Sequence, residues 1–176
     1  MVSVAVLVII TTIALVNNSR FGGTILVTNL AYDIALSMRQ AQVFGLSVKE
    51  VTPGGGEFQA GYGVHFANST PTTYILFADR NFNLRYDGAS ENIEIYTISR
   101  GNRINAFCAT LPSEVEKCAP DIGILDIVFE RPNPDALFAT DILTDTYGAA
   151  RVVVRSPQGI EKTISVSSTG QISVTE

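Results

Sequence analysis

The side chains best suited to bind a ligand lie in the segment of residues 79–88, which reads Asp-Arg-Asn-Phe-Asn-Leu-Arg-Tyr-Asp-Gly. Its first, third, fifth and ninth positions carry oxygen donors, namely Asp79, Asn81, Asn83 and Asp87. Calcium-binding loops use this spacing, because alternate positions turn their oxygen atoms toward one concave side. The segment therefore predicts Ca²⁺ as a candidate cofactor.

The same segment departs from a calcium loop at several positions. Leu84 stands where the sharp turn normally uses glycine, and Ser90 stands where a bidentate glutamate is expected, with Glu91 next to it. Arg80 and Arg85 add positive charge to the segment. A second interpretation therefore stays open, in which the segment is a turn between strands whose Asn and Asp side chains accept hydrogen bonds from backbone N–H groups.

The two cysteines, Cys108 and Cys118, are separated by nine residues. This spacing fits neither a Cys-x-x-Cys redox motif nor a zinc site, which would need closer pairs and further ligands. We expect a disulfide that closes a short loop, worth about 2–3 kcal/mol. Such a bond is typical of an oxidising compartment. Two unrelated buried thiols are the alternative.

Catalytic arrangements find little support. The single histidine, His65, falls among the polar residues of an alternating strand pattern, so we expect a surface or partly bonded histidine. The sequence has no Gly-x-Ser-x-Gly nucleophile motif, and its Gly54–Gly56 run lacks the Lys-Ser/Thr of a phosphate loop. Carboxylates such as Asp126 are scattered as on a solvated surface. We therefore expect a protein that is not an enzyme.

Basic residues do not indicate a broad nucleic-acid surface, because the net charge is -5 with only 12 Lys and Arg. Two small groups are the candidate DNA contacts: Arg100 with Arg103 in an Arg-Gly-Asn-Arg segment, and Arg151 with Arg155 on one strand face. Ordinary solvated charges explain both groups equally well. Nucleic acid is thus a candidate partner that the overall charge does not support.

The elements that would position these residues begin with a run of 19 residues without charge. A signal peptide would begin with a basic region, a buried terminal helix would be unusual, and a full membrane span needs about 20 apolar residues. The interpretation that fits best is a span whose first residues precede Met1. Its apolar side chains are those of Val2, Val4, Val6, Leu7, Val8, Ile9, Ile10, Ile13, Leu15 and Val16.

The next segment has the pattern of an amphipathic helix. Leu26, Leu30, Ile34 and Met38 recur every four residues, and we expect them to pack against the rest of the protein. No proline precedes Pro53, so one helix from Met1 to about Val48 is allowed. Its weak point is Gly22-Gly23, where a bend or local melting is expected. We divide the chain into residues 1–21 (the transmembrane or filament-core half of the helix), 22–50 (its amphipathic half) and 51–176 (a β-rich head).

The head shows strand patterns and no further helix. The segment Phe58–Phe66 alternates apolar with other residues and predicts a half-buried strand. Short apolar strands and a C-terminal meander are expected at 73–78, 93–98, 124–129, 149–155, 161–167 and 171–175. The predicted fold is α+β, with a long N-terminal helix packed on an antiparallel β-sheet.

The order of these segments resembles the type IV pilin and type II secretion pseudopilin superfamily. The segments that carry the resemblance are the apolar start Met1–Leu7, Asp33–Leu46 on the helix, Tyr74–Asp79, and the C-terminal Ile164–Val174. Together they are most similar to the minor pseudopilin class (GspH/FimT type). The processing site of that superfamily, with its leader, cleavage glycine and following acidic residue, is missing, so cleavage and N-methylation have no supporting residue.

The resemblance implies a β-sandwich head and a helix that packs with other pilin or pseudopilin subunits in a filament core. It implies a single-pass protein of the inner membrane, in contact with lipid before assembly, whose head is extracytoplasmic and which later joins a periplasmic or extracellular filament. The implied function is that of a non-enzymatic structural subunit. Two alternatives stay open: a DNA-binding minor pilin for DNA uptake, and an anchored β-domain that does not polymerise.

Overall fold

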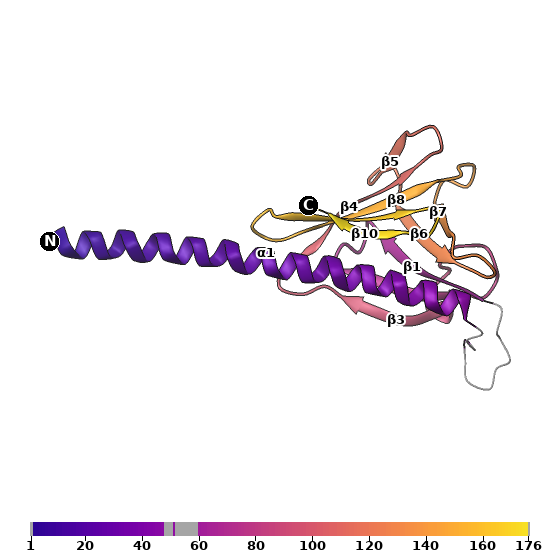
Figure 1. Cartoon of the computed structure of the whole chain (residues 1–176), viewed down its shortest axis with the longest axis horizontal. Helices are drawn as coiled ribbons and strands as arrows, with labels where there is room; N and C mark the ends of the chain where they lie inside the picture. Colours follow the sequence, from indigo (N-terminus) through magenta and orange to yellow (C-terminus); the bar gives the residue numbers. More distant parts are fainter. Residues whose placement is uncertain (1, 48–50, 52–59, 176) are drawn as a thin grey trace.

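The protein has an α+β fold in which one long helix is followed by two antiparallel sheets (Figure 1). The computed structural model describes residues 2–47, 51 and 60–175, with the helix backbone alone for residues 13–21. Helix α1 spans Val2–Leu46, and the strands gather around its C-terminal half. The N-terminal half of α1 projects away from the head.

The strands form two five-stranded sheets with the orders β3-β2-β1-β6-β7 and β10-β9-β8-β4-β5. The first sheet consists of β1 (Gly61–Ala67), β2 (Thr73–Asp79), β3 (Asn92–Thr97), β6 (Ile124–Phe129) and β7 (Ala136–Thr140). The second consists of β4 (Arg103–Thr110), β5 (Glu116–Cys118), β8 (Ala149–Arg155), β9 (Glu161–Ser167) and β10 (Ile172–Thr175). A short 3₁₀ turn, η1 (Ala89–Glu91), precedes β3.

Strands β6, β8 and β9 have the bounds that the sequence predicts. β2 and β10 differ from prediction by one residue at one end, and β3 by one residue at each end. Strands β4, β5 and β7 were not predicted. In β4 the pairing with β8 shifts register between Ile104 and Ala106, around Asn105, so the strand lacks a regular alternation. β5 has three residues and β7 has five, which is too short for a periodic signal.

Helix α1 runs without interruption through Gly22 and Gly23, so the local melting expected there does not occur. Gly23 is buried beside the side chain of Gln158, which belongs to the turn between β8 and β9, and a β-carbon on Gly23 would overlap that side chain. The glycine therefore permits close packing of helix and head.

The centre of the buried face of α1 is formed by Val27, Ala31, Ile34, Met38 and Ala41. These positions alternate spacings of four and three residues, which keeps them on one side of a helix with 3.6 residues per turn. The predicted row with a strict spacing of four advances about 40° at each step. As a result its two later members are buried, whereas its two earlier members, at positions 26 and 30, lie at the edge of the buried face and are partly exposed.

The buried hydrophobic residues form one cluster that draws on α1 and on both sheets. Within the first sheet, β1 has β2 on one side and β6 on the other. Every residue of β1 is buried, so the prediction of a half-buried strand is wrong for Gly61–Ala67. Both faces of the strand are covered. The predicted residues 58 and 59 lie outside the described part of the chain.

The last turn of α1 lies directly on the backbone of β6. A β-carbon on Gly45 would overlap the carbonyl oxygen of Phe129, whereas nothing lies within 4 Å of a β-carbon on Gly22. The absence of a side chain is therefore required for packing at Gly45, whereas at Gly22 it only weakens the helix.

We expect Gly45→Ala to lower the free energy of unfolding by about 1–3 kcal/mol, because the methyl group forces α1 away from β6. Gly22→Ala should raise it by about 1 kcal/mol, because alanine favours the helix and meets no neighbour. Denaturant unfolding of the full chain in mild detergent measures both changes. Equal effects of the two substitutions would contradict the close contact at Gly45.

Candidate functional site

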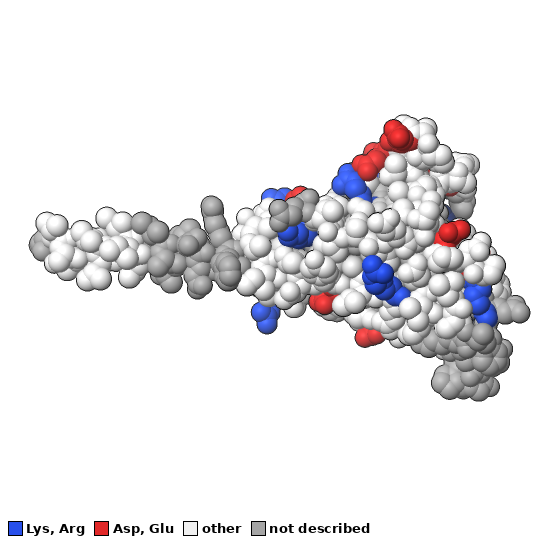
Figure 2. Space-filling view, viewed as in Figure 1, with Lys and Arg blue, Asp and Glu red and all other residues white. Residues whose placement is uncertain are grey.

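The N-terminal half of α1 presents apolar side chains to solvent. Val2, Val4, Val6, Leu7, Val8, Ile9 and Ile10 are each between 49% and 80% exposed. The predicted side chains of Ile13, Leu15 and Val16 lie outside the described part of the structure. The described atoms of this half carry no charge (Figure 2). We call residues 2–19 the apolar half of α1.

Between Val2 and Ile10, exposed apolar side chains surround the axis of α1 on all sides. Consecutive residues of an α-helix are about 100° apart, so Val6, Leu7, Val8 and Ile9 together face every direction. The hydroxyl groups of Thr11 and Thr12 do not add a polar face. Oγ1 of Thr11 donates to the carbonyl oxygen of Leu7 at 2.9 Å, and Oγ1 of Thr12 donates to that of Val8 at 2.7 Å. A helix that is apolar all round is normally covered on every side.

Residues 22–46 form the half of α1 that packs on the head, and we call them the head half. The outer face of the head half carries large apolar side chains that the sequence patterns above did not single out. These four residues, which we call the outer stripe, are Ile25, Tyr32, Leu36 and Val43, and they are between 45% and 62% exposed. Their spacings of seven, four and seven residues are the signal that could have identified them, because such spacings keep side chains on one line of a helix.

The predicted calcium segment forms a loop held by its own side chains. Oδ1 and Oδ2 of Asp79 accept the backbone N–H groups of Asn83 and Leu84, at 3.1 Å and 2.7 Å. The amide nitrogens of Asn81 and Asn83 both donate to Oδ2 of Asp87 at 2.6 Å. These donated bonds lower the pKa of the Asp87 carboxyl. The carboxylates thus accept hydrogen bonds from the loop itself, as the turn interpretation requires.

Two further residues complete this loop. Glu91 is buried and accepts the backbone N–H groups of Arg80 and Asp87, at 3.3 Å and 2.8 Å. Leu84 adopts a left-handed backbone conformation with φ of 63°, at the position where calcium loops use glycine. The loop therefore forms the predicted turn with backbone strain at Leu84, which a glycine at this position would not have. Calcium binding stays a prediction.

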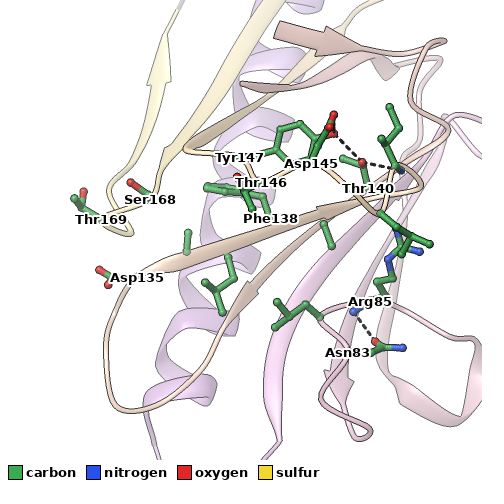
Figure 3. A pocket seen from close by; sticks show the side chains of 16 residues that line it. Asn83, Arg85, Asp135, Phe138, Thr140, Asp145, Thr146, Tyr147, Ser168 and Thr169 are labelled. Atoms are coloured by element: carbon green, nitrogen blue, oxygen red, sulfur yellow. Dashed lines mark hydrogen bonds between the residues drawn. The ribbon is translucent and has the colours of Figure 1, made fainter. Parts of the chain in front are cut away.

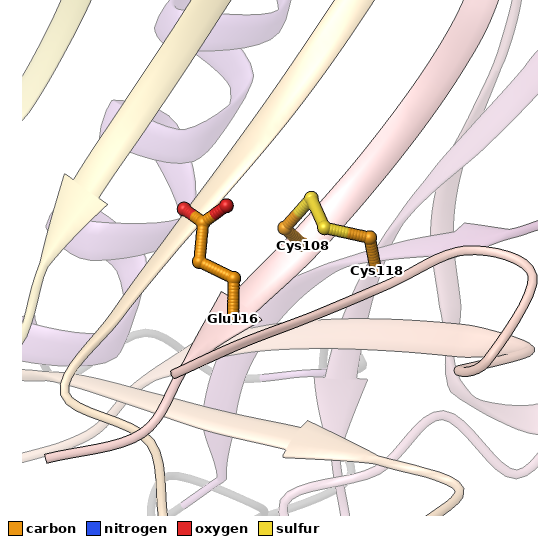
Figure 4. A group of neighbouring side chains, drawn as sticks. All are labelled: Cys108, Glu116 and Cys118. Carbon is orange, nitrogen blue, oxygen red and sulfur yellow. A yellow bond between two sulfur atoms is a disulfide. The ribbon is translucent and has the colours of Figure 1, made fainter. Parts of the chain in front are cut away.

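Among the described residues, the side chains of Cys108, Glu116 and Cys118 lie close enough together to share a metal ion (Figure 4). The two cysteines form a disulfide, so their sulfur atoms are not thiolate ligands. Glu116 accepts two hydrogen bonds from Arg151, at 2.9 Å and 2.8 Å. The group is a structural crosslink beside an ion pair.

His65 and Asp126 form a buried pair. This corrects the expectation that Asp126 lies on a solvated surface, and of the two states expected for His65 it is the bonded one that the structure has. Nδ1 of His65 lies 2.6 Å from Oδ1 of Asp126, and Asp126 is fully buried between neighbouring strands. The ring of Tyr86 covers that of His65 at 4.6 Å between centroids. Burial raises the pKa of the Asp126 carboxyl, and the hydrogen bond to His65 opposes this shift. The pair ties the loop that contains Tyr86 to β1 and β6.

The arginines proposed as DNA contacts differ in their surroundings. Arg151 pairs with Glu116, and Nε of Arg155 lies 3.7 Å from Oε1 of Glu161. Arg155 also lies opposite Arg103 in the pairing of β8 with β4. Arg100 is exposed in the turn that precedes β4. The carboxylates beside Arg151 and Arg155 reduce the positive potential there, and DNA binding stays a prediction.

A hollow of about 550 Å³ lies beside β7 (Figure 3). Three of its polar side chains are bonded to one another: the hydroxyls of Thr140 and Tyr147 lie 3.0 Å apart, and Tyr147 donates to Asp145 at 3.2 Å. Lys117 forms an ion pair with the same carboxylate and lowers the pKa of Asp145. These bonds stabilise the loop between β7 and β8.

Comparisons with protein-family models, with curated proteins and with solved structures found no match for this chain. In the part of the chain that the structure describes, none of the helices is both long and apolar enough to cross a membrane. An assignment of function therefore depends on the surfaces described above.

Asp79→Ala tests the structural part played by the loop. We expect it to lower the free energy of unfolding by about 1–3 kcal/mol, because two backbone N–H groups lose a buried acceptor. If the side chain acts only in the turn, the cost is the same in EDTA and in excess CaCl₂. Calorimetry of the unaltered chain with CaCl₂ tests the metal interpretation. If CaCl₂ produces no heat of binding and no change in melting temperature, that interpretation is excluded.

Asp126→Asn tests the buried pair through its pH dependence. Folding raises the pKa of Asp126 above its ordinary value of 3.8, so the stability that this carboxyl contributes is full below that value and is lost as pH rises. The cost of the substitution should therefore be larger at pH 4 than at pH 7 in urea unfolding. The exposed Asp121→Asn serves as the control. A cost that grows with pH would contradict this interpretation.

Proposed function

We propose that this protein is a filament subunit of the pilin or pseudopilin type, in which the apolar half of α1 packs among copies of itself or related subunits. The observation that carries the proposal is the apolar half itself, which projects from the head and exposes large apolar side chains on all sides. Exposed apolar surface of this extent marks an interaction site in soluble domains.

The all-round exposure favours a bundle of helices over a dimer. A single partner helix covers one side of the apolar half, and the side chains on the opposite side stay in water. Several neighbours are needed to cover side chains that face in every direction, such as Val6 to Ile9. A filament core supplies such neighbours.

The energy available is sufficient to hold subunits together. Full burial of a Val, Leu or Ile side chain contributes about 1.5–3 kcal/mol. The seven exposed side chains between Val2 and Ile10 therefore contribute on the order of 10 kcal/mol per subunit when several neighbours cover them. Association costs are of similar size. The balance supports assembly that is strong only when many subunits take part.

The head fits the same proposal. Its two antiparallel sheets share one core with the head half of α1, which supports the β-sandwich implied by the resemblance to minor pseudopilins. The disulfide between Cys108 and Cys118 is typical of proteins outside the reducing cytoplasm. Contact of the apolar half with membrane lipid before assembly, and an inner-membrane location, remain predictions.

Val8→Lys tests the proposal directly. A lysine at the centre of an apolar layer costs about 3 kcal/mol, which corresponds to about a 100-fold weaker association. We expect the concentration at which the chain assembles, after detergent is removed, to rise by about this factor. Light scattering and electron microscopy measure the assembled fraction.

The matched control is Leu143→Lys, which places the same charge on an exposed leucine in the loop between β7 and β8. This variant should assemble as the unaltered chain does. A Val8→Lys chain that assembles at the same concentration as the control would exclude packing through the apolar half.

A further inference from the structure

We propose that the outer edge of β7 binds an extended peptide segment of another protein, which pairs with β7 and lengthens the first sheet by one strand. This binding site belongs to the head and does not involve the apolar half of α1, so it is separate from the proposed filament. Three features of the head carry the proposal: the position of β7, the direction of its backbone groups and the side chains around the hollow beside it.

Strand β7 is an edge strand without the usual protection against pairing. It ends the first sheet, in which β6 is its neighbour. Edge strands commonly carry charged residues that prevent pairing with other chains. The opposite edge strand, β3, has the exposed Glu94, whereas β7 reads Ala-Leu-Phe-Ala-Thr and has no charged residue. All five residues of β7 line the hollow of about 550 Å³, which therefore follows the strand along its length (Figure 3).

The pairing of β6 with β1 fixes which residues of β6 bond to β7. The backbone N–H of Asn68 donates to the carbonyl oxygen of Gly123 at 2.9 Å, directly beyond the end of the paired segment. In the same register the residues of β6 that bond to β1 are Leu125, Ile127 and Phe129. Successive residues of an antiparallel strand bond to opposite neighbours, so the residues between these three bond to β7.

On β7 those bonds reach the second and fourth residues of the strand. The N–H and C=O groups of Phe138 and the N–H group of Thr140 therefore point away from β6. Ala136 has the same direction, because its N–H donates to the carbonyl oxygen of Ser168 at 2.9 Å. Ser168 also lines the hollow, so the hollow lies on this outer side of β7. A strand placed in the hollow can bond to the outward groups.

The spacing of these groups suits a peptide in extended conformation. From Ala136 to Thr140 the strand advances four residues, or about 13 Å, which is enough to pair with a strand of about five residues. In this mode of recognition the main-chain hydrogen bonds supply affinity, and contacts with alternate side chains supply specificity. The described strands of this chain all belong to its own two sheets. The occupant is therefore an extended segment of a different protein.

The side chains around the hollow indicate which peptides bind best. Phe138 is buried in the core cluster, and Ile142 and Tyr147, which line the hollow, pack against the same cluster. The hydroxyl group of Tyr147 lies 3.0 Å from that of Thr140, which is on the same face of β7 as Phe138. We expect the residue of the peptide that lies opposite Phe138 to be apolar, because it faces these side chains.

The first test screens an array of random eight-residue peptides against the full chain in mild detergent. Each bound peptide is then made again with a single N-methyl group, placed at every position in turn. An added strand turns alternate N–H groups toward β7. Methylation should therefore weaken binding about tenfold at every second residue of the paired segment and much less at the residues between. Absence of any bound peptide, or methylation effects that do not alternate, would overturn the proposal.

A pair of variants locates the binding site on the chain. Thr140→Pro and Thr140→Val both remove the hydroxyl group that bonds with Tyr147 and Ile142, but only proline also removes the backbone N–H. Because that N–H points away from β6, proline leaves the bonds between β6 and β7 in place. The proline variant should bind the peptide about tenfold more weakly than the valine variant. Equal affinities in two variants with the same circular dichroism spectrum would contradict the site. If the proline variant does not fold, the methylation series decides.

Two further measurements exclude other occupants and other sites. Val8→Lys should bind the peptide with unchanged affinity, and weaker binding would place the peptide on the apolar half and overturn the proposal. Sedimentation of the full chain in the same detergent tests whether a second copy occupies the edge of β7. A dimer that is present in the Thr140→Val variant and lost in the Thr140→Pro variant would assign this edge to a second copy and would also overturn the proposal.

Discussion

The structure depends on the burial of one face of α1, from Val27 to Ala41, in a core that both sheets share. This contact fixes the head half of the helix. Because α1 is continuous from Val2 to Leu46, the same contact also fixes the direction in which the apolar half projects. Arg39 and Gln42 reinforce it by donating hydrogen bonds to the carbonyl oxygens of Ile172 and Gly170. A loosely attached helix could fold back over its own head, whereas this one leaves its apolar half available for a partner.

The sequence was sufficient to predict one helix followed by strands, but not the strands β4, β5 and β7. Long uniform runs carry strong periodic signals, which is why β6, β8 and β9 were placed correctly. Short strands such as β5 are stabilised by their neighbours and carry no such signal. The helix through Gly22-Gly23 was predicted to be weak for a related reason: propensity describes an isolated helix, and here packing against the turn at Gln158 outweighs it.

Features of the candidate site that neighbouring residues of the sequence form could be predicted. Features that form only when distant parts of the chain meet in the fold could not. The apolar half and the bonded loop at Asp79 follow from consecutive residues. The pair of His65 with Asp126 does not, because these residues are 61 positions apart and only the pairing of β1 with β6 brings them together. Exposed apolar residues such as Leu36 were not predicted, because they lie on the face of α1 opposite the row of apolar residues spaced by four.

The most direct test of the central claim compares sedimentation of the full chain with that of a variant lacking residues 1–21, both in buffer without detergent. If the apolar half drives assembly, the full chain sediments as large particles and the shortened chain as a folded monomer, with the head retaining its circular dichroism spectrum. A shortened chain that forms the same particles, or a full chain that stays monomeric at high concentration, would contradict the claim.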